Sequence, residues 1–155
     1  MLVRRATIED AEAVTALHGF LHRMHTEAHP DIFTIFDPEL TRPRFERMLA
    51  ADDALSWVAE IDGEAVGYAS ANLVHREASD EVREERALHV HELAVAPQAR
   101  GTGVGRALMQ AAEDYARSLR LASVSLQTWV FNTGAHDFYE RLGYERLSMR
   151  MRRRL

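Results

Sequence analysis

The stretch that decides the fold runs from Val95 to Arg106 and reads Val-Ala-Pro-Gln-Ala-Arg-Gly-Thr-Gly-Val-Gly-Arg. It lies between a segment typical of a strand (residues 88–95) and a segment with apolar residues at helical spacing. Glycines at such a junction let successive backbone N–H groups point into one concave space, where the helix dipole adds positive potential. The turn therefore predicts phosphate or diphosphate binding, and a plain glycine-rich turn is the alternative.

Two common nucleotide-binding motifs do not fit this turn. A dinucleotide fingerprint has the spacing G-x-G-x-x-G and an acid about 20 residues later. Here the spacing is G-x-G-x-G, and residues 121–126 contain no acid. A P-loop requires a lysine after its last glycine, and all 19 basic residues of this chain are arginine. Both nucleotide-binding motifs are therefore excluded.

Length and composition limit the class of protein. The 155 residues suit one domain (1–155), and 46% hydrophobic with 28% charged residues is typical of a globular chain. No apolar run approaches the ~20 residues of a membrane helix, and no secretory leader is recognisable, so we expect no membrane association. Because cysteine is absent, disulfides and a cysteine nucleophile are excluded, and we expect a cytoplasmic location. The net charge of −5 argues against nucleic-acid binding.

Hydrophobic periodicity predicts hairpins in the first half and strand–helix alternation in the second. Strands are expected at residues 2–5, 57–61, 65–74, 88–95, 122–130 (as a central strand) and 144–151. Helices are expected from Thr7 to His29, over 44–51, after the glycine turn and over 133–142. Asp62-Gly63 predicts a type I′ turn, and the charged segment 76–86 predicts a solvated loop. The expected class is α/β (α+β), with a mixed sheet and helices on both faces.

Three segments together carry a family resemblance. Residues 100–105 match the pattern [Q/R]-x-x-G-x-[G/A], and residues 132–144 are similar to N-x-x-A-x-x-[FL]-Y-x-x-x-G-F. The opening residues 3–10 are similar to I-R-x-A-x-x-x-D. With these motifs the chain resembles the GCN5-related N-acetyltransferase (GNAT) superfamily over nearly its whole length. The resemblance implies the GNAT fold, with a mixed central sheet of about six to seven strands.

The resemblance also implies acetyl-coenzyme A as the co-substrate, with no metal. Backbone amides of the glycine turn would hold its diphosphate, and the edge of residues 93–95 would pair with the pantetheine arm as an added strand does. Asn132 would hydrogen-bond the same arm. The expected binding residues are Leu93, Ala94, Val95, Arg100, Gly101, Thr102, Gly103, Val104, Gly105, Arg106, Asn132, Ala135, Phe138 and Tyr139.

Transfer of the acetyl group to an amine requires a base and an acid. An alkyl amine with a pKa near 10.4 costs roughly 4–5 kcal/mol to hold neutral at pH 7, so a base with a pKa near 6.5 suits the task. By resemblance, Tyr139 takes the position of the general acid. Several relatives place a glutamate on the strand before the second motif, and the matching residue here is Gln127, which cannot accept a proton.

Histidines offer another base. His89 and His91 are two apart on a predicted strand and so share a face. This H-x-H pattern is similar to the arylalkylamine N-acetyltransferases, where such a pair passes the amine proton through water. We predict His91 as the nearer base and His89 as the relay, and simple packing of both is the alternative. Glu92, expected on the opposite face unless a bulge re-aims it, is the backup base.

Four further histidines, His18, His22, His25 and His29, fall on one face of the first predicted helix. A polar helix edge or a wall of the acceptor site is favoured over a metal site, because no third ligand is evident. The acceptor is expected to be a small-molecule amine or a peptide N-terminus, and a homodimer is compatible with the resemblance. A non-catalytic acetyl-CoA-binding regulatory module and a metal- or phosphate-handling hydrolase are the alternatives from other classes.

Overall fold

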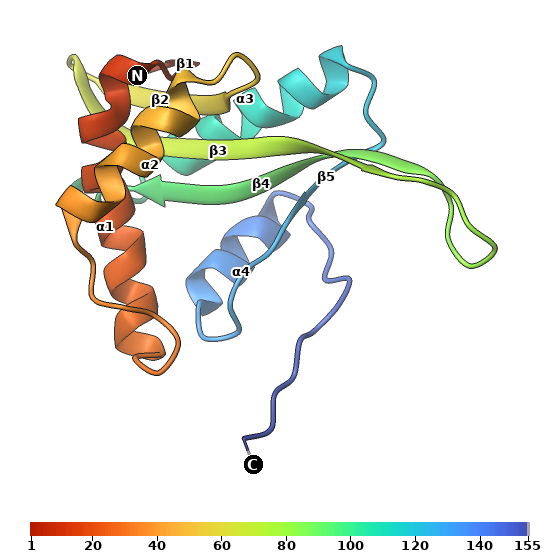
Figure 1. Ribbon diagram of the computed structural model, residues 1–155. Helices are drawn as coiled ribbons and strands as arrows, with labels where there is room; N and C mark the ends of the chain where they lie inside the picture. The colour runs from red at the N-terminus through yellow and green to blue at the C-terminus, as the bar shows by residue number, and fades with distance from the viewer. Residues whose placement is uncertain (155) are drawn as a thin grey trace.

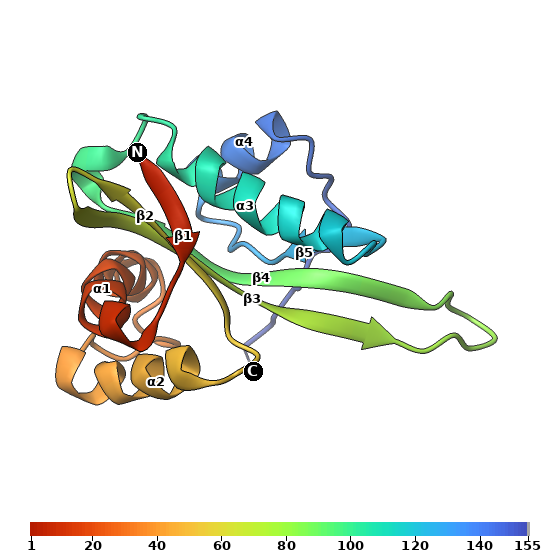
Figure 2. The same cartoon turned by 90° about the horizontal axis from the view of Figure 1, so that it is seen from above.

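A five-stranded sheet separates two pairs of helices in the computed structural model, which describes residues 1–154 (Figures 1 and 2). Strands β1 to β4 are antiparallel neighbours in that order, and β5 adds to β4 in parallel. The 3₁₀ turns η1 (Ile8–Asp10) and η2 (Pro97–Ala99) precede α1 and α3. The elements are β1 (Leu2–Arg5), α1 (Ala11–Ala28), α2 (Pro38–Ala50), β2 (Leu55–Ile61), β3 (Glu64–Arg76), β4 (Glu85–Val95), α3 (Val104–Ser118), β5 (Ser123–Leu126) and α4 (Thr133–Arg141).

Each face of the sheet has its own core. Helices α1 and α2 cover one face, and α3 and α4 lie on the other (Figure 2). Successive residues of β2 face opposite sides, so Trp57 joins the core under α3 and Val58 joins the core under α1. Leu108 of α3 and Phe45 of α2 are fully buried in these two cores. The predicted mixed α/β architecture with helices on both faces is therefore confirmed.

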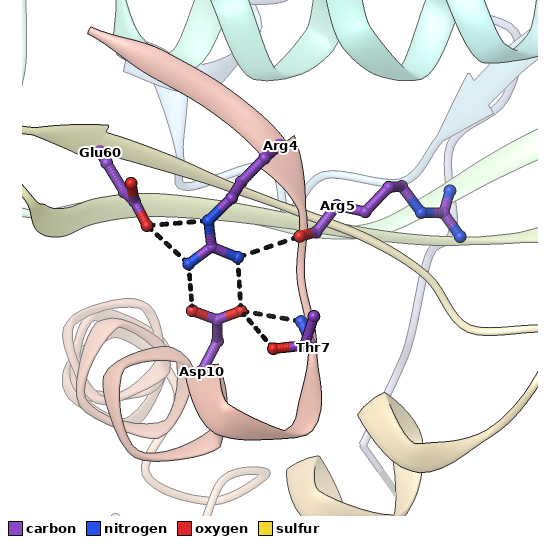
Figure 3. Close-up of polar contacts among 5 residues, drawn as sticks. All are labelled: Arg4, Arg5, Thr7, Asp10 and Glu60. Atoms are coloured by element: carbon purple, nitrogen blue, oxygen red, sulfur yellow. Dashed lines mark hydrogen bonds and ion pairs between the residues drawn. The ribbon is translucent and has the colours of Figure 1, made fainter.

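The start of the first helix is fixed by Arg4 (Figure 3). Its guanidinium donates to both carboxylate oxygens of Asp10 at 2.8 Å and to Glu60 at 2.9 Å. The backbone N–H of Thr7 donates to the same Asp10 carboxylate at 2.8 Å, as in a capping box. The hydrogen bond from Arg4 lowers the pKa of Asp10, against the opposing effect of burial. The predicted N-cap Thr7 thus caps the 3₁₀ turn η1 that leads into α1, and the N-cap of α1 itself is Asp10.

Helix α2 is longer than the predicted 44–51 because it begins at Pro38. The side chain of Asp37 accepts hydrogen bonds from the N–H groups of Glu39 and Leu40, at 2.9 and 3.4 Å. Pro38 then occupies the first helical position, where a missing N–H costs nothing. Pro43, which lies before the predicted start at residue 44, is inside the helix.

The hairpin of β3 and β4 is also longer than predicted. Ion pairs between His75 and Glu84 (3.0 Å) and between Arg76 and Glu85 (2.9 Å) hold its far end. The expected loop 76–86 therefore shrinks to residues 77–84. The Asp62-Gly63 turn has positive φ at both residues, as a type I′ turn requires.

The end of the chain departs most from the prediction. The sheet has five strands rather than six or seven, because residues 144–151 form no strand. Their alternating apolar side chains are exposed, Leu147 by 87% and Met149 by 71%. Alternation makes a strand only where a neighbouring edge supplies hydrogen-bond partners. Only Ser123–Leu126 of the predicted strand 122–130 pairs, and that strand lies at the edge of the sheet instead of its centre.

In residues 1–154 no helix has both the length and the apolar character that crossing a membrane would require.

Candidate active site

A cavity of about 790 Å³ opens where β4 and β5 diverge. The two strands pair from Ala87 with Ser123 to Val90 with Leu126, and beyond that point the chain leaves the sheet. The edge of β4 from residue 91 to Val95 that faces this gap therefore has no strand partner. Helix α1, the glycine turn, residues 126–129 and α4 complete the walls. The volume lies in the range of small-molecule sites.

The glycine turn forms one end of the cavity. Gly101 and Gly103 have φ of +78° and +93°, values that side-chain-bearing residues rarely adopt. Gly103 is the N-cap of α3, so the free N–H groups of the first helical turn adjoin the cavity. Arg100 and Arg106 line the cavity as well, and the Nε of Arg100 donates to the carbonyl of Val95 at 3.3 Å. Free amides, a helix N-terminus and two cations together can hold a diphosphate.

Close packing fixes the position of this turn. The hydroxyl of Thr102 donates to the carbonyl of Ala99 at 2.7 Å and ties the turn to itself. A Cβ at Gly105 would lie 3.3 Å from the ring of Phe138, so the missing side chain lets α4 approach α3. Val104 is buried in the core beneath the turn. The side chains of Thr102 and Val104 therefore point away from the cavity, and only the backbone of these two residues is available at the turn.

A bulge in β4 decides where two of the predicted catalytic residues point. Ser70 pairs with Glu92 but the next residue, Ala71, pairs with Val90, so His91 is the extra residue. A bulge breaks the alternation of side chains between the two faces. Glu92 consequently turns to the side of α1, and His91 and Glu92 line one cavity. The expectation that Glu92 faces the opposite side is corrected by this bulge.

Glu92 is held by three side chains from other elements. Arg44 of α2 contacts one carboxylate oxygen at 2.6 Å, and the hydroxyl of Tyr68 donates to the other at 2.6 Å. The Nδ1 of His18 lies 3.5 Å from that second oxygen and 3.1 Å from the Tyr68 hydroxyl. Because Tyr68 gives its own proton to Glu92, we infer that the Nδ1 of His18 carries a proton and donates it to the tyrosine oxygen.

These contacts set the charge of Glu92. Burial raises its pKa, but the adjacent His18, the hydrogen bond from Tyr68 and the charge of Arg44 lower the pKa to about 2. Burial and the neighbouring carboxylate raise the pKa of Tyr68, which keeps that hydroxyl protonated. Glu92 is therefore a fixed carboxylate at neutral pH and a weak proton acceptor.

The two histidines of the H-x-H pattern have different surroundings. Their ring centres are 5.0 Å apart. The Nδ1 of His89 is hydrogen-bonded to the hydroxyl of Ser125 at 3.0 Å, and burial followed by the charge of His91 lowers the pKa of His89. His91 is exposed and lines the cavity. His89 is half-buried and does not line it. Of the two histidines of this pattern, His91 is therefore the one that borders the cavity.

Tyr139 of α4 lines the cavity opposite these residues. Burial raises its pKa to about 12, so the hydroxyl stays protonated at neutral pH. Throughout residues 1–154 no buried side-chain nitrogen or oxygen lacks a hydrogen-bond partner. Within that part of the chain the Tyr139 hydroxyl makes no hydrogen bond, so it must reach open space, and the cavity is the space beside it.

The cavity thus brings together most of the residues predicted from sequence. Asn132 caps α4 by accepting from the N–H of Ala135 at 3.2 Å, which leaves its amide nitrogen free to donate. His89, Thr102 and Val104 do not line the cavity. The predicted residues that do are His91, Glu92, Leu93, Ala94, Val95, Arg100, Gly101, Gly103, Gly105, Arg106, Asn132, Ala135, Phe138 and Tyr139.

The sequence predicted only some of the residues at the end of the cavity away from the glycine turn. The spacing of the four histidines on α1 indicated a common face, and His18, His22 and His25 do line the cavity. Trp129 also lines the cavity, and nothing in the sequence pointed to it, because residues 122–130 were expected to form a strand. Arg44 and Tyr68 were missed as well, since nothing local links them to Glu92. In the described part of the chain no three histidine or acidic side chains are placed to hold a metal ion.

The chain belongs to the acetyltransferase (GNAT) family, whose model matches residues 20–144. An uncharacterized N-acetyltransferase of Archaeoglobus fulgidus is 35% identical over 90% of this chain and 89% of its own length. YhfO of Bacillus subtilis, also an uncharacterized N-acetyltransferase, is 28% identical over 94% of this chain and 90% of its own length. A similar protein of Methanocaldococcus jannaschii, MJ1207, is 35% identical, and the match spans only 43% of its length.

Solved structures show the same fold. A tetramutant of the BH1408 protein from Bacillus halodurans superposes with a TM-score of 0.94 over the full length of both chains, at 26% identity. The aminoglycoside N-acetyltransferase AAC(6')-Iy in complex with CoA superposes with a TM-score of 0.77 over 99% of this chain and 93% of its own, at 21% identity. At 21% identity, the likeness to AAC(6')-Iy concerns the fold alone.

Proposed function

We propose that this chain transfers the acetyl group of acetyl-CoA to a primary amine by direct attack within a ternary complex. The observation that carries the proposal is one cavity in which the free edge of β4 adjoins the amide cradle of the glycine turn. Family membership supports the same reaction class. The chain has no cysteine to form a thioester intermediate, which favours direct attack. A cytoplasmic location remains our expectation.

In this proposal the cofactor-binding wall uses mainly backbone groups. The amides of the turn and the cations of Arg100 and Arg106 hold the diphosphate. The unpaired edge of Leu93 to Val95 pairs with the amides of the pantetheine arm, as a peptide adds to a sheet edge. Asn132 donates its free amide to the same arm. Acetyl-CoA supplies the acetyl thioester, and these contacts place it beside His91 and Tyr139.

His91 is the proposed base. It takes the amine proton directly or through water, and an imidazole is suited to this near neutral pH. His89 lies behind it, in ring contact, and passes the proton on. Glu92, with a pKa of about 2, contributes fixed negative charge beside the reacting amine rather than proton transfer.

Tyr139 is the proposed acid. Because burial raises its pKa to about 12, it first acts as a hydrogen-bond donor to the sulfur on which negative charge develops. The new bond joins the amine nitrogen to the acetyl carbon, and the carbon–sulfur bond breaks. The amine proton leaves to His91, and the thiolate receives its proton from Tyr139 or from water that Tyr139 orients.

The test combines a binding measurement with a turnover measurement. We expect acetyl-CoA to bind the purified chain in calorimetry and thiol release to depend on an added amine. His91→Ala should keep this binding and lose turnover near neutral pH, with partial recovery at high pH, where the amine is already neutral. Unchanged turnover in His91→Ala would remove His91 from the mechanism and leave His18 as the next imidazole on the cavity.

Two other outcomes separate the alternatives. Binding of acetyl-CoA without turnover of any amine would favour a regulatory module that only senses acetyl-CoA. No binding of acetyl-CoA would overturn the proposal, and metal-dependent hydrolysis would then be tested instead.

A further inference from the structure

The end of the cavity away from the glycine turn is built from rings. We call the side chains of His25, His29, Phe33, Trp129 and Phe131 the aromatic wall. His25, Phe33 and Trp129 line the cavity, and His29 and Phe131 pack against them. The ring centre of Phe33 lies 5.0 Å from that of His25 and 5.1 Å from that of Trp129. Phe131 lies 5.6 Å from His25 and 5.4 Å from His29. These spacings are those of aromatic pairs in contact, so the wall is a packed surface.

The aromatic wall is held in place by its neighbours as well as by its own ring contacts. The carbonyl of Thr34 accepts hydrogen bonds from the Nε2 of His22 at 2.8 Å and from the hydroxyl of Thr26 at 2.9 Å. The Nδ1 of His25 is hydrogen-bonded to the carbonyl of Leu21 at 2.9 Å. The loop after α1 is therefore fastened to α1 before any acceptor binds, which lowers the ordering cost of binding.

This end of the cavity offers little to a polycation. Among the described residues, Glu92 is the only acidic side chain that lines the cavity, and Arg44 already pairs with it at 2.6 Å. Three arginines, Arg100, Arg106 and Arg141, line the cavity as well. A second or third ammonium group would therefore find no free carboxylate, and Arg141, the arginine that is not proposed to pair with the diphosphate, would repel it.

The same end suits a flat or bulky apolar group. Phe33 and Trp129 line the cavity, and Leu21 and Met24 of α1 line it beside them. Burial is the largest influence on His25 and lowers its pKa, which leaves its ring uncharged at neutral pH. An aromatic or apolar body placed here buries its surface against rings and thioether, with the gain that such burial normally brings.

We infer that the acceptor is a monoamine whose body is an aromatic ring or a bulky apolar group, seated against Phe33 and Trp129. Glu92 supplies the one negative charge that faces the amine before it loses its proton. The inference rests on the proposed acetyl transfer and adds the chemical class of its acceptor. Polyamines and aminoglycosides are poor acceptors in this view.

The experiment compares four acceptors at saturating acetyl-CoA: 2-phenylethylamine, ethylamine, spermidine and kanamycin. We expect kcat/KM to be highest for 2-phenylethylamine, by at least about tenfold, because it alone fills the aromatic wall. Trp129→Ala should lower kcat/KM for 2-phenylethylamine by about tenfold or more and change the value for ethylamine by less than about twofold. Trp129→Phe should restore most of the loss.

The control variant is Ile35→Ala, because Ile35 is 87% exposed in the same loop and does not line the cavity. It should leave all four values unchanged. Equal or higher kcat/KM for spermidine or kanamycin would overturn the inference and leave acetyl transfer standing. An equal loss for all acceptors in Trp129→Ala would also overturn it. Absence of acetyl-CoA binding to the unmodified chain would instead refute the proposed function, and this inference with it.

Discussion

The two walls of the cavity are built in different ways. The proposed cofactor-binding wall consists mainly of one continuous segment, from the edge of β4 through the glycine turn into α3, and it presents mostly backbone amides. Asn132, at the start of α4, is its contribution from another segment. The proposed acceptor wall, which comprises Glu92 and the aromatic wall, consists of side chains from segments far apart in the chain, such as Phe33 and Trp129. A site made of backbone groups can therefore be predicted from a short sequence motif. A site made of side chains from distant segments forms only when the chain folds.

The two walls also differ in what constrains their residues. At the glycine turn the constraint is conformational, because Gly101 and Gly103 have positive φ. On the acceptor side it is packing and charge, because Glu92 depends on Arg44, Tyr68 and His18 at the same time. Substitutions in the two walls should therefore fail in different measurements, and four predictions test this.

The largest effect is expected at the junction of the walls, in Tyr139→Phe. Loss of the hydroxyl should lower kcat by about 10²–10⁴-fold and leave the KM for acetyl-CoA unchanged, as expected for an acid that acts in the transition state. Steady-state kinetics with a fixed amine measures both. Tyr144→Phe is the matched control, because the Tyr144 hydroxyl donates to Glu113 instead. Equal turnover of Tyr139→Phe and the unmodified chain would contradict the prediction.

The next effect concerns acid stability and belongs to the acceptor wall. The pKa of Glu92 is about 2 in the folded protein, against about 4.3 in an unfolded chain. A lowered carboxylate pKa stabilises the fold above the unfolded value, and this stabilisation is lost as pH falls from about 4.3 to 2. The loss is about 3 kcal/mol on that basis.

Urea unfolding at pH 7, 4 and 3 measures this dependence. Glu92→Gln should flatten it over the same pH range and leave the smaller slope of Asp10, whose pKa is also lowered. Glu140→Gln, at an exposed carboxylate, serves as the control. An unchanged slope in Glu92→Gln would show that Arg44, Tyr68 and His18 do not hold a charged Glu92.

A third prediction tests the conformational constraint of the cofactor-binding wall. Gly103 has φ of +93°, and a side chain there costs about 1–2 kcal/mol of strain. Relief of that strain turns the amides away from the diphosphate, so Gly103→Ala should raise the Kd for acetyl-CoA by about 5–30-fold in calorimetry. Gly63→Ala, at φ of +83° in the β2–β3 turn, is the control. It should lower stability similarly and leave the Kd unchanged.

The smallest effect is expected where the end of the chain meets the acceptor wall. Asp31 accepts from Arg152 at 3.0 Å and also pairs with Arg154, both of them exposed. Exposed pairs contribute little, so Asp31→Asn should shift Tm by no more than about 2 °C, less at high salt. Thermal unfolding followed by circular dichroism measures this. A larger shift would mean that the C-terminal segment helps to hold the loop after α1.

Particular residues show how far local patterns reach. Thr7 and Asp10 at the start of the first helix, and Asp62-Gly63 between β2 and β3, were predicted correctly because each forms its structure with near neighbours in the chain. Residues 144–151 have the alternation of a strand and form none. The bulge at His91 turns Glu92 to the other face of the sheet, and no residue type within β4 predicts this bulge.

The sequence alone determined the family, the glycine turn, and His91 and Tyr139 as candidates, because each depends on a short run of residues whose conformation is local. Tertiary structure alone decided that β5 ends at Leu126, that Glu92 faces Arg44 and Tyr68, and that Trp129 meets Phe33. Such contacts join residues that are distant in sequence, and their free energy exists only once both partners are brought together. The acceptor wall is therefore a property of the fold, and the cofactor-binding wall a property of the motif.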